Sequence, residues 1–310
     1  MLEPLGSDLW FADGGVVSFK GFDYPTRMVV VRLADGALWL WSPVERTAAL
    51  EGKVRALGPV RHIISPNKLH FLFLGQWQTP FPDASLWATA ATIAKCRELR
   101  FSGALADDPP AEWKGQIDQF YFTNLFFMNE LIFFHRASRT AIIADLSQTF
   151  SEPFLKRHWP WWMRPIAKLS KMVEGWGHPP IDYRISFRNR ASARPKIREL
   201  IGKHPEHVVV AHGEVVRTDG EAFLRRAFFM AAPVVLTSAT LSIRPTSAIG
   251  IGSKSGTRRC PGMVGNGLAD FRRLRRESCL TAPRSFGREA PTFRSFIHLP
   301  GVPEGGRSAH

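Results

Sequence analysis

Cysteine is scarce in this chain: Cys96, Cys260 and Cys279 are the only three in 310 residues, and no two of them form a C-x-x-C pair. A zinc ribbon needs closely spaced thiols and a disulfide framework needs several pairs, so the sequence supports neither. We expect Cys96 to be a reduced, buried residue on a helix. The low cysteine content favours a cytoplasmic location.

Long apolar runs are also missing. The most hydrophobic stretch, residues 120–134, is interrupted by Asn124, Asn129 and Glu130, and it is shorter than the ~20 residues of a membrane-spanning helix. We therefore assign it to the core. The first residues lack a basic segment followed by an apolar run, so we expect no signal peptide.

Several catalytic motifs are absent as well. The chain contains neither a P-loop nor a G-x-G-x-x-G sequence, so a nucleotide-phosphate fold is not indicated. Ser65, Ser138 and Ser147 lie outside any G-x-S-x-G context, which argues against a serine hydrolase of that type.

The positive charge is unevenly distributed. Residues 231–310 contain twelve lysines and arginines against four acidic residues, a net charge of +8 that leaves +6 of the total +14 for residues 1–230. Gly, Pro, Ser and Arg dominate this segment and patterned apolar stretches fade. We predict one domain over 1–230 and a disordered, basic tail over 231–310. A basic nucleic-acid arm is the alternative, but we expect no specific nucleic-acid partner.

Residues 1–230 alternate between strand and helix patterns. Strands are predicted at 8–19 (a pair with a turn at Asp13-Gly14-Gly15), 28–33, 37–41, 60–64, 86–88, 131–135, 140–145 and 208–211. Helices are predicted after a capping box at Ser42-Pro43-Val44-Glu45, at 90–99, at 151–173 with a break near Pro160, at 195–201, and from a second capping box at Thr218 to about Met230. Two strand-rich blocks, each followed by helices, indicate a layered α/β protein.

Three candidate metal ligands lie at the end of a predicted strand or in the loop that follows one. They are His70, Asp145 and His212. Side chains at strand exits are held rigidly, and His and Asp are usual ligands of Zn, Fe or Mn. Together they could bind one metal ion and leave a position open for water. Their linear spacing does not show that they meet, so the prediction depends on the fold.

A set of segments carries a resemblance to a known family. These segments are 8–13, 27–33, 35–39, 42–44, Ser65-Pro66-Asn67-Lys68-Leu69-His70, 129–135, 138–140 ahead of Asp145-Leu146, and Ala211-His212-Gly213-Glu214. In this order they resemble the metallo-β-lactamase-fold superfamily, a four-layer αββα sandwich, and within it a branch catalogued as domain of unknown function 4336. The resemblance extends from about Leu5 to Met230, and the tail has no counterpart.

The resemblance implies metal-assisted hydrolysis of an ester, thioester or phosphoester. The loop that follows the strand at 60–64 departs from the family's metal-binding motif. Asp145 matches the family's bridging aspartate, and His212 matches its final ligand histidine. Where the family has His-x-His-x-Asp-His, Pro66 and Lys68 stand at the first two histidines and Phe71 at the last. The ligand count speaks against a dinuclear site.

Two interpretations of the site stay open. In the first, one Zn, Fe or Mn ion is bound by His70, Asp145 and His212, and Asp145 is also the catalytic residue. In the second, the chain is a catalytically inactive, metal-free ligand-binding protein in which Asp145 and His212 hold each other by a hydrogen bond. In both, Lys68 and Arg139 are candidate ligand-binding residues for a phosphate or carboxylate. The sequence identifies neither the small-molecule ligand nor the oligomeric state.

Residues 154–173 mix lysines and arginines with Trp159, Trp161 and Trp162. A helix packed on the core is the simplest interpretation. A lid over the pocket, an oligomer contact and contact with a membrane surface are the alternatives, since interfacial helices use the same residue types.

Overall fold

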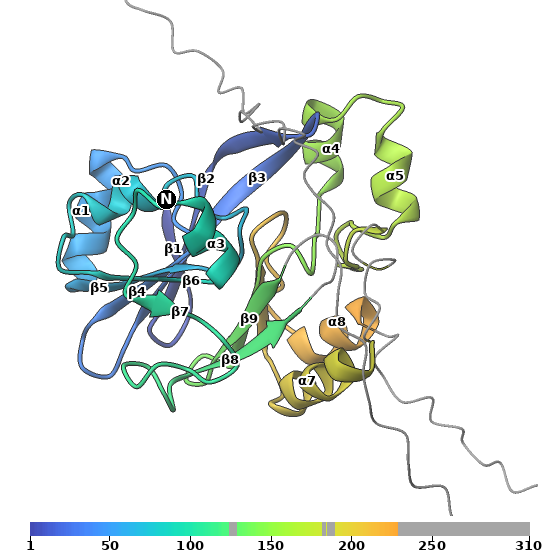
Figure 1. The fold of residues 1–310 in the computed structure, drawn as a ribbon. Helices are drawn as coiled ribbons and strands as arrows, with labels where there is room; N and C mark the ends of the chain where they lie inside the picture. Colours follow the sequence, from blue (N-terminus) through green and yellow to red (C-terminus); the bar gives the residue numbers. More distant parts are fainter. Residues whose placement is uncertain (124–128, 182–183, 185–189, 229–310) are drawn as a thin grey trace, which may run out of the picture. The chain divides into compact units, whose positions relative to one another are not determined.

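The computed structural model describes residues 1–228 except 124–128, 182–183 and 185–189 (Figure 1). The predicted tail at 231–310 lies outside the described residues, as do Asn124 and Met230.

The first sheet has seven strands in the order β1-β2-β3-β4-β5-β6-β7. Strands β1 to β4 are antiparallel to their neighbours, and β4 to β7 are parallel. Its strands are β1 (Leu2–Gly6), β2 (Leu9–Phe19), β3 (Phe22–Arg32), β4 (Leu38–Trp41), β5 (Val60–Ser65), β6 (Ser85–Ala88) and β7 (Gly103–Ala104). The helices between its parallel strands are α1 (Ala48–Leu57), α2 (Leu74–Gln78) and α3 (Ala90–Lys95).

The second sheet has four strands in the order β11-β10-β9-β8. Strands β8, β9 and β10 form an antiparallel meander, and β11 pairs parallel with β10. Its strands are β8 (Ile117–Phe122), β9 (Glu130–His135), β10 (Thr140–Ile143) and β11 (His207–Val210). Between β10 and β11 the chain forms α4 (Glu152–His158), α5 (Arg164–Leu169) and α7 (Arg190–Gly202), and α8 (Gly220–Ala227) follows β11.

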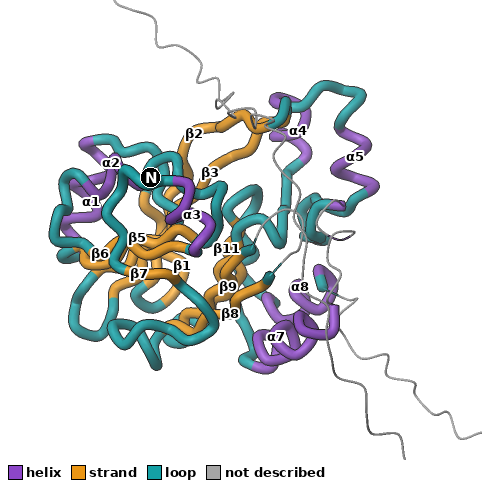
Figure 2. Tube along the Cα trace, in the orientation of Figure 1, coloured by secondary structure: helices purple, strands orange, loops and turns teal. Residues whose placement is uncertain are grey.

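The two sheets pack on each other, and each has helices on its outer face (Figures 1 and 2). Between the sheets, Trp39 of β4 lies edge-on to Phe133 of β9 with ring centroids 5.1 Å apart, within one buried apolar cluster. A second cluster joins the first sheet to α1 and α2, and a third joins the second sheet to α7 and α8. Because strands buried on both faces need apolar side chains throughout, β4 and β10 have no exposed residue. The predicted four-layer αββα fold is confirmed.

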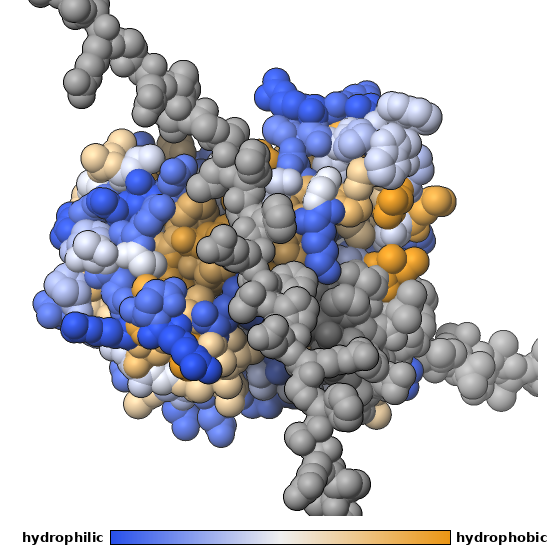
Figure 3. Space-filling model, turned by 45° about the horizontal axis from the view of Figure 1, so that its top comes forward, coloured by the Kyte–Doolittle hydropathy of each residue, from blue (hydrophilic) through white to orange (hydrophobic). Residues whose placement is uncertain are grey.

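Helices α4 and α5 lie beside the long β2–β3 hairpin rather than on a sheet (Figure 1). They are separated near Pro160, as predicted. In Figure 3, hydrophobic side chains (orange) lie close to hydrophilic ones (blue) on this part of the surface, at the upper right. Among the described residues, no helix combines the length and apolarity that crossing a membrane requires.

Two local sequence predictions are wrong. Asp13-Gly14-Gly15 is not a turn but a bulge within a continuous β2, with a register shift between Asp13 and Val16. Glycine weakens strand pairing without ending it when a neighbouring strand continues alongside. Ser42 does not cap α1, because Thr47 does: its side chain accepts a hydrogen bond from the Leu50 amide.

Further element ends also differ from the predictions. α3 ends at Lys95, so Cys96 is the buried residue that follows the helix. α8 starts at Gly220 after Asp219, which has φ 55° and makes no side-chain capping bond, so the Thr218 capping box does not form.

Buried His135 in β9 predicts a pH dependence of stability. Its Nδ1 lies 2.8 Å from Ser138 Oγ, and burial lowers its pKa to about 4 from the ordinary 6.5. The unfolded chain therefore binds more protons between pH 6.5 and 4, so stability is full above pH 6.5 and falls as the pH drops towards 4. The loss is on the order of 3 kcal/mol.

Urea unfolding of the wild type and of the His135→Gln variant between pH 7.5 and 4.5 measures the contribution of His135 to the pH dependence of stability. Glutamine keeps a polar partner for Ser138 but does not titrate, so the variant should lose less stability on acidification. Identical pH slopes for the two proteins would assign the acid sensitivity to other groups.

Candidate metal centre

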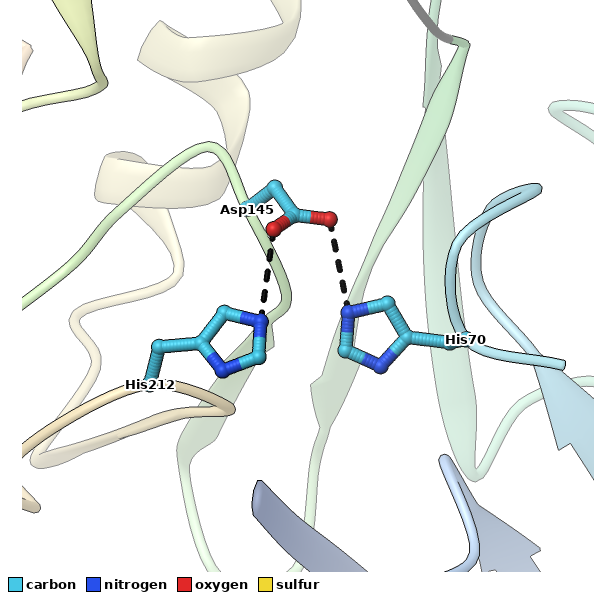
Figure 4. Close-up of side chains that lie close together, drawn as sticks. All are labelled: His70, Asp145 and His212. Carbon is cyan, nitrogen blue, oxygen red and sulfur yellow. Dashed lines mark ion pairs between the residues drawn. The ribbon is translucent and has the colours of Figure 1, made fainter. Parts of the chain in front are cut away.

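His70, Asp145 and His212 meet at one end of the two sheets (Figure 4). His70 lies in the loop after β5, Asp145 follows β10 and His212 follows β11. One ligand atom from each residue lies within 4.8 Å of the other two. Asp145 Oδ2 is 3.3 Å from His70 Nε2, and Asp145 Oδ1 is 3.3 Å from His212 Nε2. The fold therefore brings the three predicted ligands together.

The orientation of His212 is fixed by a backbone carbonyl. Its Nδ1 lies 2.7 Å from the oxygen of Pro25 in β3. A carbonyl only accepts, so Nδ1 carries the proton, and in a neutral ring Nε2 then presents a lone pair. That lone pair faces an oxygen of Asp145 at 3.3 Å. Two electron-rich atoms in this position require a proton or a cation between them.

His70 is held from behind by Ser42. The Ser42 hydroxyl lies 2.6 Å from His70 Nδ1, which leaves Nε2 towards Asp145. Ser42 has a positive φ of 49°, and its amide donates to the carbonyl of Ile64 at the end of β5. Burial lowers the pKa of His70, against the influence of Asp145. Burial therefore favours the neutral imidazole, the form that binds metal ions.

Asn67 orients the carboxylate and its own loop together. Its Nδ2 donates to Asp145 Oδ2 at 2.7 Å, and its Oδ1 accepts from the amide of Leu69 at 2.8 Å. Neither Asn67 nor Ser42 is among the site residues predicted from the sequence. Their only sequence signal is their position in segments shared with the family.

Glu130 holds the turn that carries Asp145. It is fully buried at the start of β9. Its carboxyl oxygens accept from the amides of Ala144, Asp145 and Leu146 at 3.0, 3.0 and 3.2 Å. The turn after β10 is thereby tied to the neighbouring strand, which fixes the direction of the Asp145 side chain.

The two buried carboxyl groups differ in pKa. Burial, with the added charge of Asp145, raises the pKa of Glu130 to about 8. Burial also acts to raise the pKa of Asp145, but hydrogen bonds and charges from His212 and His70 outweigh it and hold the pKa below its ordinary value. The negative charge of the pair therefore resides on Asp145, the carboxylate that faces the imidazoles.

The loop with His212 is positioned by Arg27 and Gly213. The buried Arg27 guanidinium donates to the carbonyls of Val210 and Gly213 at 2.8 and 2.5 Å. Gly213 has φ +122°, and a Cβ there would lie 2.2 Å from the Thr149 carbonyl oxygen. Only glycine fits this position, which accounts for the His212-Gly213 pair.

A pocket of about 360 Å³ opens onto the triad. Its walls come mainly from the β2–β3 hairpin and the loop after β5, with Lys20, Lys68 and Lys95 among the lining residues. Apolar and aromatic residues form much of the remaining wall: Val17, Phe19, Phe22, Tyr24, Leu69, Phe71, Leu72 and Phe73. Lys68 therefore lies where an anionic group of a bound molecule could contact it.

The structure does not bring Arg139 to this pocket. Arg139 precedes β10, whereas Asp145 follows it, so the two lie at opposite ends of a strand that rises roughly 3.3 Å per residue. Its side-chain Nε donates to the carbonyl of His204 at 2.9 Å. It supports the β9–β10 turn, and the predicted joint anion grip with Lys68 does not form.

The residues at the family's missing histidine positions have structural contacts. The Pro66 carbonyl accepts from the amide of Leu131, and Phe71 packs on the core cluster beneath α1 and α2. The ammonium group of Lys95 lies 3.6 Å from the centroid of the Phe71 ring. Within the part of the chain that the structure describes, the triad is the one group of three potential metal-binding side chains.

Residues 15–154 match the family model described as domain of unknown function (DUF4336). Comparison with curated proteins gave no match.

Solved structures show the same fold at low sequence identity. The DIM-1 metallo-β-lactamase exposed to ceftazidime is 16% identical over 74% of this chain and 95% of its own, with a TM-score of 0.51. TMB-1 is 14% identical over 74% and 96%, with a TM-score of 0.52. A metallo-β-lactamase from Erythrobacter litoralis with β-mercaptoethanol in the active site is 13% identical over 74% and 95%, with a TM-score of 0.50. These likenesses concern the fold.

Proposed function

We propose that this chain, which matches the DUF4336 model over residues 15–154 and has the metallo-β-lactamase fold, is a mononuclear metal-dependent hydrolase of that superfamily. His70 and His212 are the proposed metal ligands, and Asp145 is a ligand that also serves as general base. The proposed substrates are esters, thioesters or phosphoesters, the class that the fold family suggests.

The observation that carries this proposal is the His212 contact. Its Nδ1 lies against the Pro25 carbonyl, so Nε2 is the atom directed at Asp145, and in the neutral ring Nε2 has a lone pair that a metal ion shared with Asp145 could accept. Each imidazole Nε2 lies 3.3 Å from a different oxygen of Asp145, and one ligand atom from each residue lies within 4.8 Å of the other two, a spacing at which the three side chains could share one ion. The donor set of two imidazoles and one carboxylate suits Zn, Fe or Mn.

When bound, the metal would supply Lewis-acid activation of water and of a carbonyl or phosphoryl oxygen. The chain's own residues do the remaining work. Asp145 stays ionised and can accept a proton, while Asn67 holds its Oδ2 in place. Lys68 offers a positive charge to an anionic group of a substrate in the pocket. The aromatic walls would exclude water from an apolar group of the substrate.

Turnover assays test the proposal. Full-length protein loaded separately with Zn, Fe or Mn should hydrolyse at least one compound in a panel of esters, thioesters and phosphoesters. The activity should disappear on chelation and return when the metal is restored. Metal-loaded protein without turnover across the panel would contradict a hydrolase function.

A metal-free ligand-binding protein is the second candidate. The Asn67 amide donates to Asp145 Oδ2 at 2.7 Å, and protonated imidazoles could satisfy the carboxylate without an ion. Lys68, at a family ligand position, favours anions over cations. Native mass spectrometry that finds a bound organic anion, no metal and no turnover would support this function instead.

A further inference from the structure

Residues 162–169, which comprise helix α5 and the two residues before it, have an apolar stripe on their exposed side as well as on their buried side. Met163 and Ala167, one turn apart, are buried against the rest of the molecule. Trp162, Ile166 and Leu169, spaced i, i+4 and i+7, are 59%, 43% and 83% exposed. A surface helix normally carries polar residues on its outer face. This helix therefore presents a second apolar face with no described residue covering it.

Exposed apolar residues concentrate around this stripe. Among the described residues, eight large hydrophobic side chains are exposed, and six of them fall between positions 161 and 181. The three outside the stripe are Trp161, Trp176 and Ile181, which are 78%, 43% and 52% exposed. Single exposed apolar residues are normal, whereas a concentration of this kind marks an interaction surface.

The segment is well packed, so its exposed residues do not result from a poorly folded helix. Trp159 is buried, and its indole Nε1 donates to the carbonyl of Asp23 at 2.9 Å. Its ring lies edge-on to Phe22 at 4.8 Å between centroids. Phe150, Leu155 and other buried residues complete an apolar cluster under α4 and α5. The inner face is anchored, and the outer stripe is held in a fixed position.

Positive charge surrounds the stripe. Residues 152–181 contain five lysines and arginines and two glutamates, Glu152 and Glu174. The basic residues are Lys156, Arg157, Arg164, Lys168 and Lys171, of which all but Arg164 are exposed. Lys171 lies over the Trp176 ring at 3.8 Å from its centroid. Apolar residues, tryptophans and basic side chains thus share one surface.

We propose that residues 152–181 form a docking surface for an anionic membrane. Tryptophans, aliphatic side chains and a ring of basic residues suit the boundary between lipid headgroups and acyl chains. Charge complementarity selects this occupant over a second copy of the chain. Two copies that paired these stripes would bring ten lysines and arginines into one interface against four glutamates. An anionic lipid surface instead attracts each basic residue.

Co-sedimentation of the full chain with vesicles tests this inference. The protein should bind vesicles containing phosphatidylglycerol, bind phosphatidylcholine vesicles at least tenfold more weakly, and dissociate as salt is raised. The Trp162→Ala/Ile166→Ser/Leu169→Ser variant should lose binding about tenfold or more. Because all three side chains are exposed, its circular dichroism and unfolding curve should match the wild type.

Charge variants distinguish this surface from non-specific attraction. One variant removes three charges at the surface: Lys156→Gln/Lys168→Gln/Lys171→Gln. The matched control removes three exposed charges from the first sheet's side and the loop before β8: Lys53→Gln/Arg61→Gln/Lys114→Gln. Only the first should weaken vesicle binding strongly.

Three outcomes would overturn the proposal. Equal losses of vesicle binding in the two charge variants would indicate general electrostatic attraction. Unchanged binding in the apolar variant would place the membrane contact in another part of the chain, such as the basic segment after residue 230. A concentration-dependent dimer, abolished by the apolar variant and without vesicle binding, would identify a second copy as the occupant. None of these outcomes depends on metal binding or turnover, so the test is independent of the proposed hydrolase function.

Discussion

The Asp145→Ala variant is expected to lose metal affinity by roughly 100-fold or more, because even residues that only orient metal ligands contribute about 10–100-fold. Asp145 lies between both imidazoles, 3.3 Å from each Nε2. Without it, His70 and His212 remain as two neutral ligands with no negative charge to balance the cation. His212→Ala should show a comparable loss. Wild-type protein purified from cells grown with Zn, Fe or Mn should contain about one metal ion per chain by elemental analysis, as the three-ligand site predicts.

Two further variants sharpen this result. Ser42→Ala removes the hydroxyl behind His70 without touching a ligand, so we expect a smaller loss of roughly tenfold. His204→Ala is the matched histidine control, since His204 pairs with Glu221 on the surface, and it should bind metal as the wild type does. Competition with a chromogenic chelator measures the metal affinity of the wild type and of all four variants. Wild-type protein without metal above background, or an Asp145→Ala variant that retains it, would favour the metal-free function.

The candidate ligands could be predicted because each depends on a strong local pattern. A buried strand that ends in His or Asp predicts both the element and the exit of the side chain, and the family resemblance supplied the fold that brings the exits together. The separation of 4.8 Å or less among the ligand atoms is the spatial result that the sequence alone could not give.

The supporting residues could not be predicted because their roles arise from contacts distant in sequence. Ser42 sits in a Ser-Pro-Val-Glu pattern that matches a capping box, but it contacts His70 instead. Pro25 acts through its carbonyl alone, which side-chain chemistry does not reveal. Glu130 offered a sequence signal, because it is a carboxylate at the start of an apolar strand.

The Arg139 prediction failed because strand direction was not considered. Residues before and after the same strand lie at opposite edges of the sheet, so a basic residue in the β9–β10 turn cannot reach a site beyond the end of β10. The same reasoning explains why Lys68, in the loop after β5, does line the pocket next to His70.

Replacing Glu130 with alanine is expected to lower the free energy of unfolding by about 3–5 kcal/mol. Three backbone amides, those of residues 144, 145 and 146, would lose their acceptor in a fully buried position. Each unsatisfied buried donor costs roughly 1–3 kcal/mol, and water in the vacated space offsets part of the total. Urea unfolding monitored by tryptophan fluorescence measures the change.

Two controls separate the loss of this acceptor from the loss of a carboxyl group as such. Glu130→Gln keeps one oxygen as acceptor and has nearly the same volume, so it should cost about 2 kcal/mol or less. Glu112→Ala removes an exposed carboxylate and should change stability by no more than about 0.5 kcal/mol. Equal effects of alanine and glutamine at position 130 would mean that the carbonyl-type acceptor retained by glutamine does not hold the turn. Because that turn directs Asp145, we also expect Glu130→Ala to bind metal more weakly than Glu130→Gln, which links the stability of the β10 exit to the formation of the site.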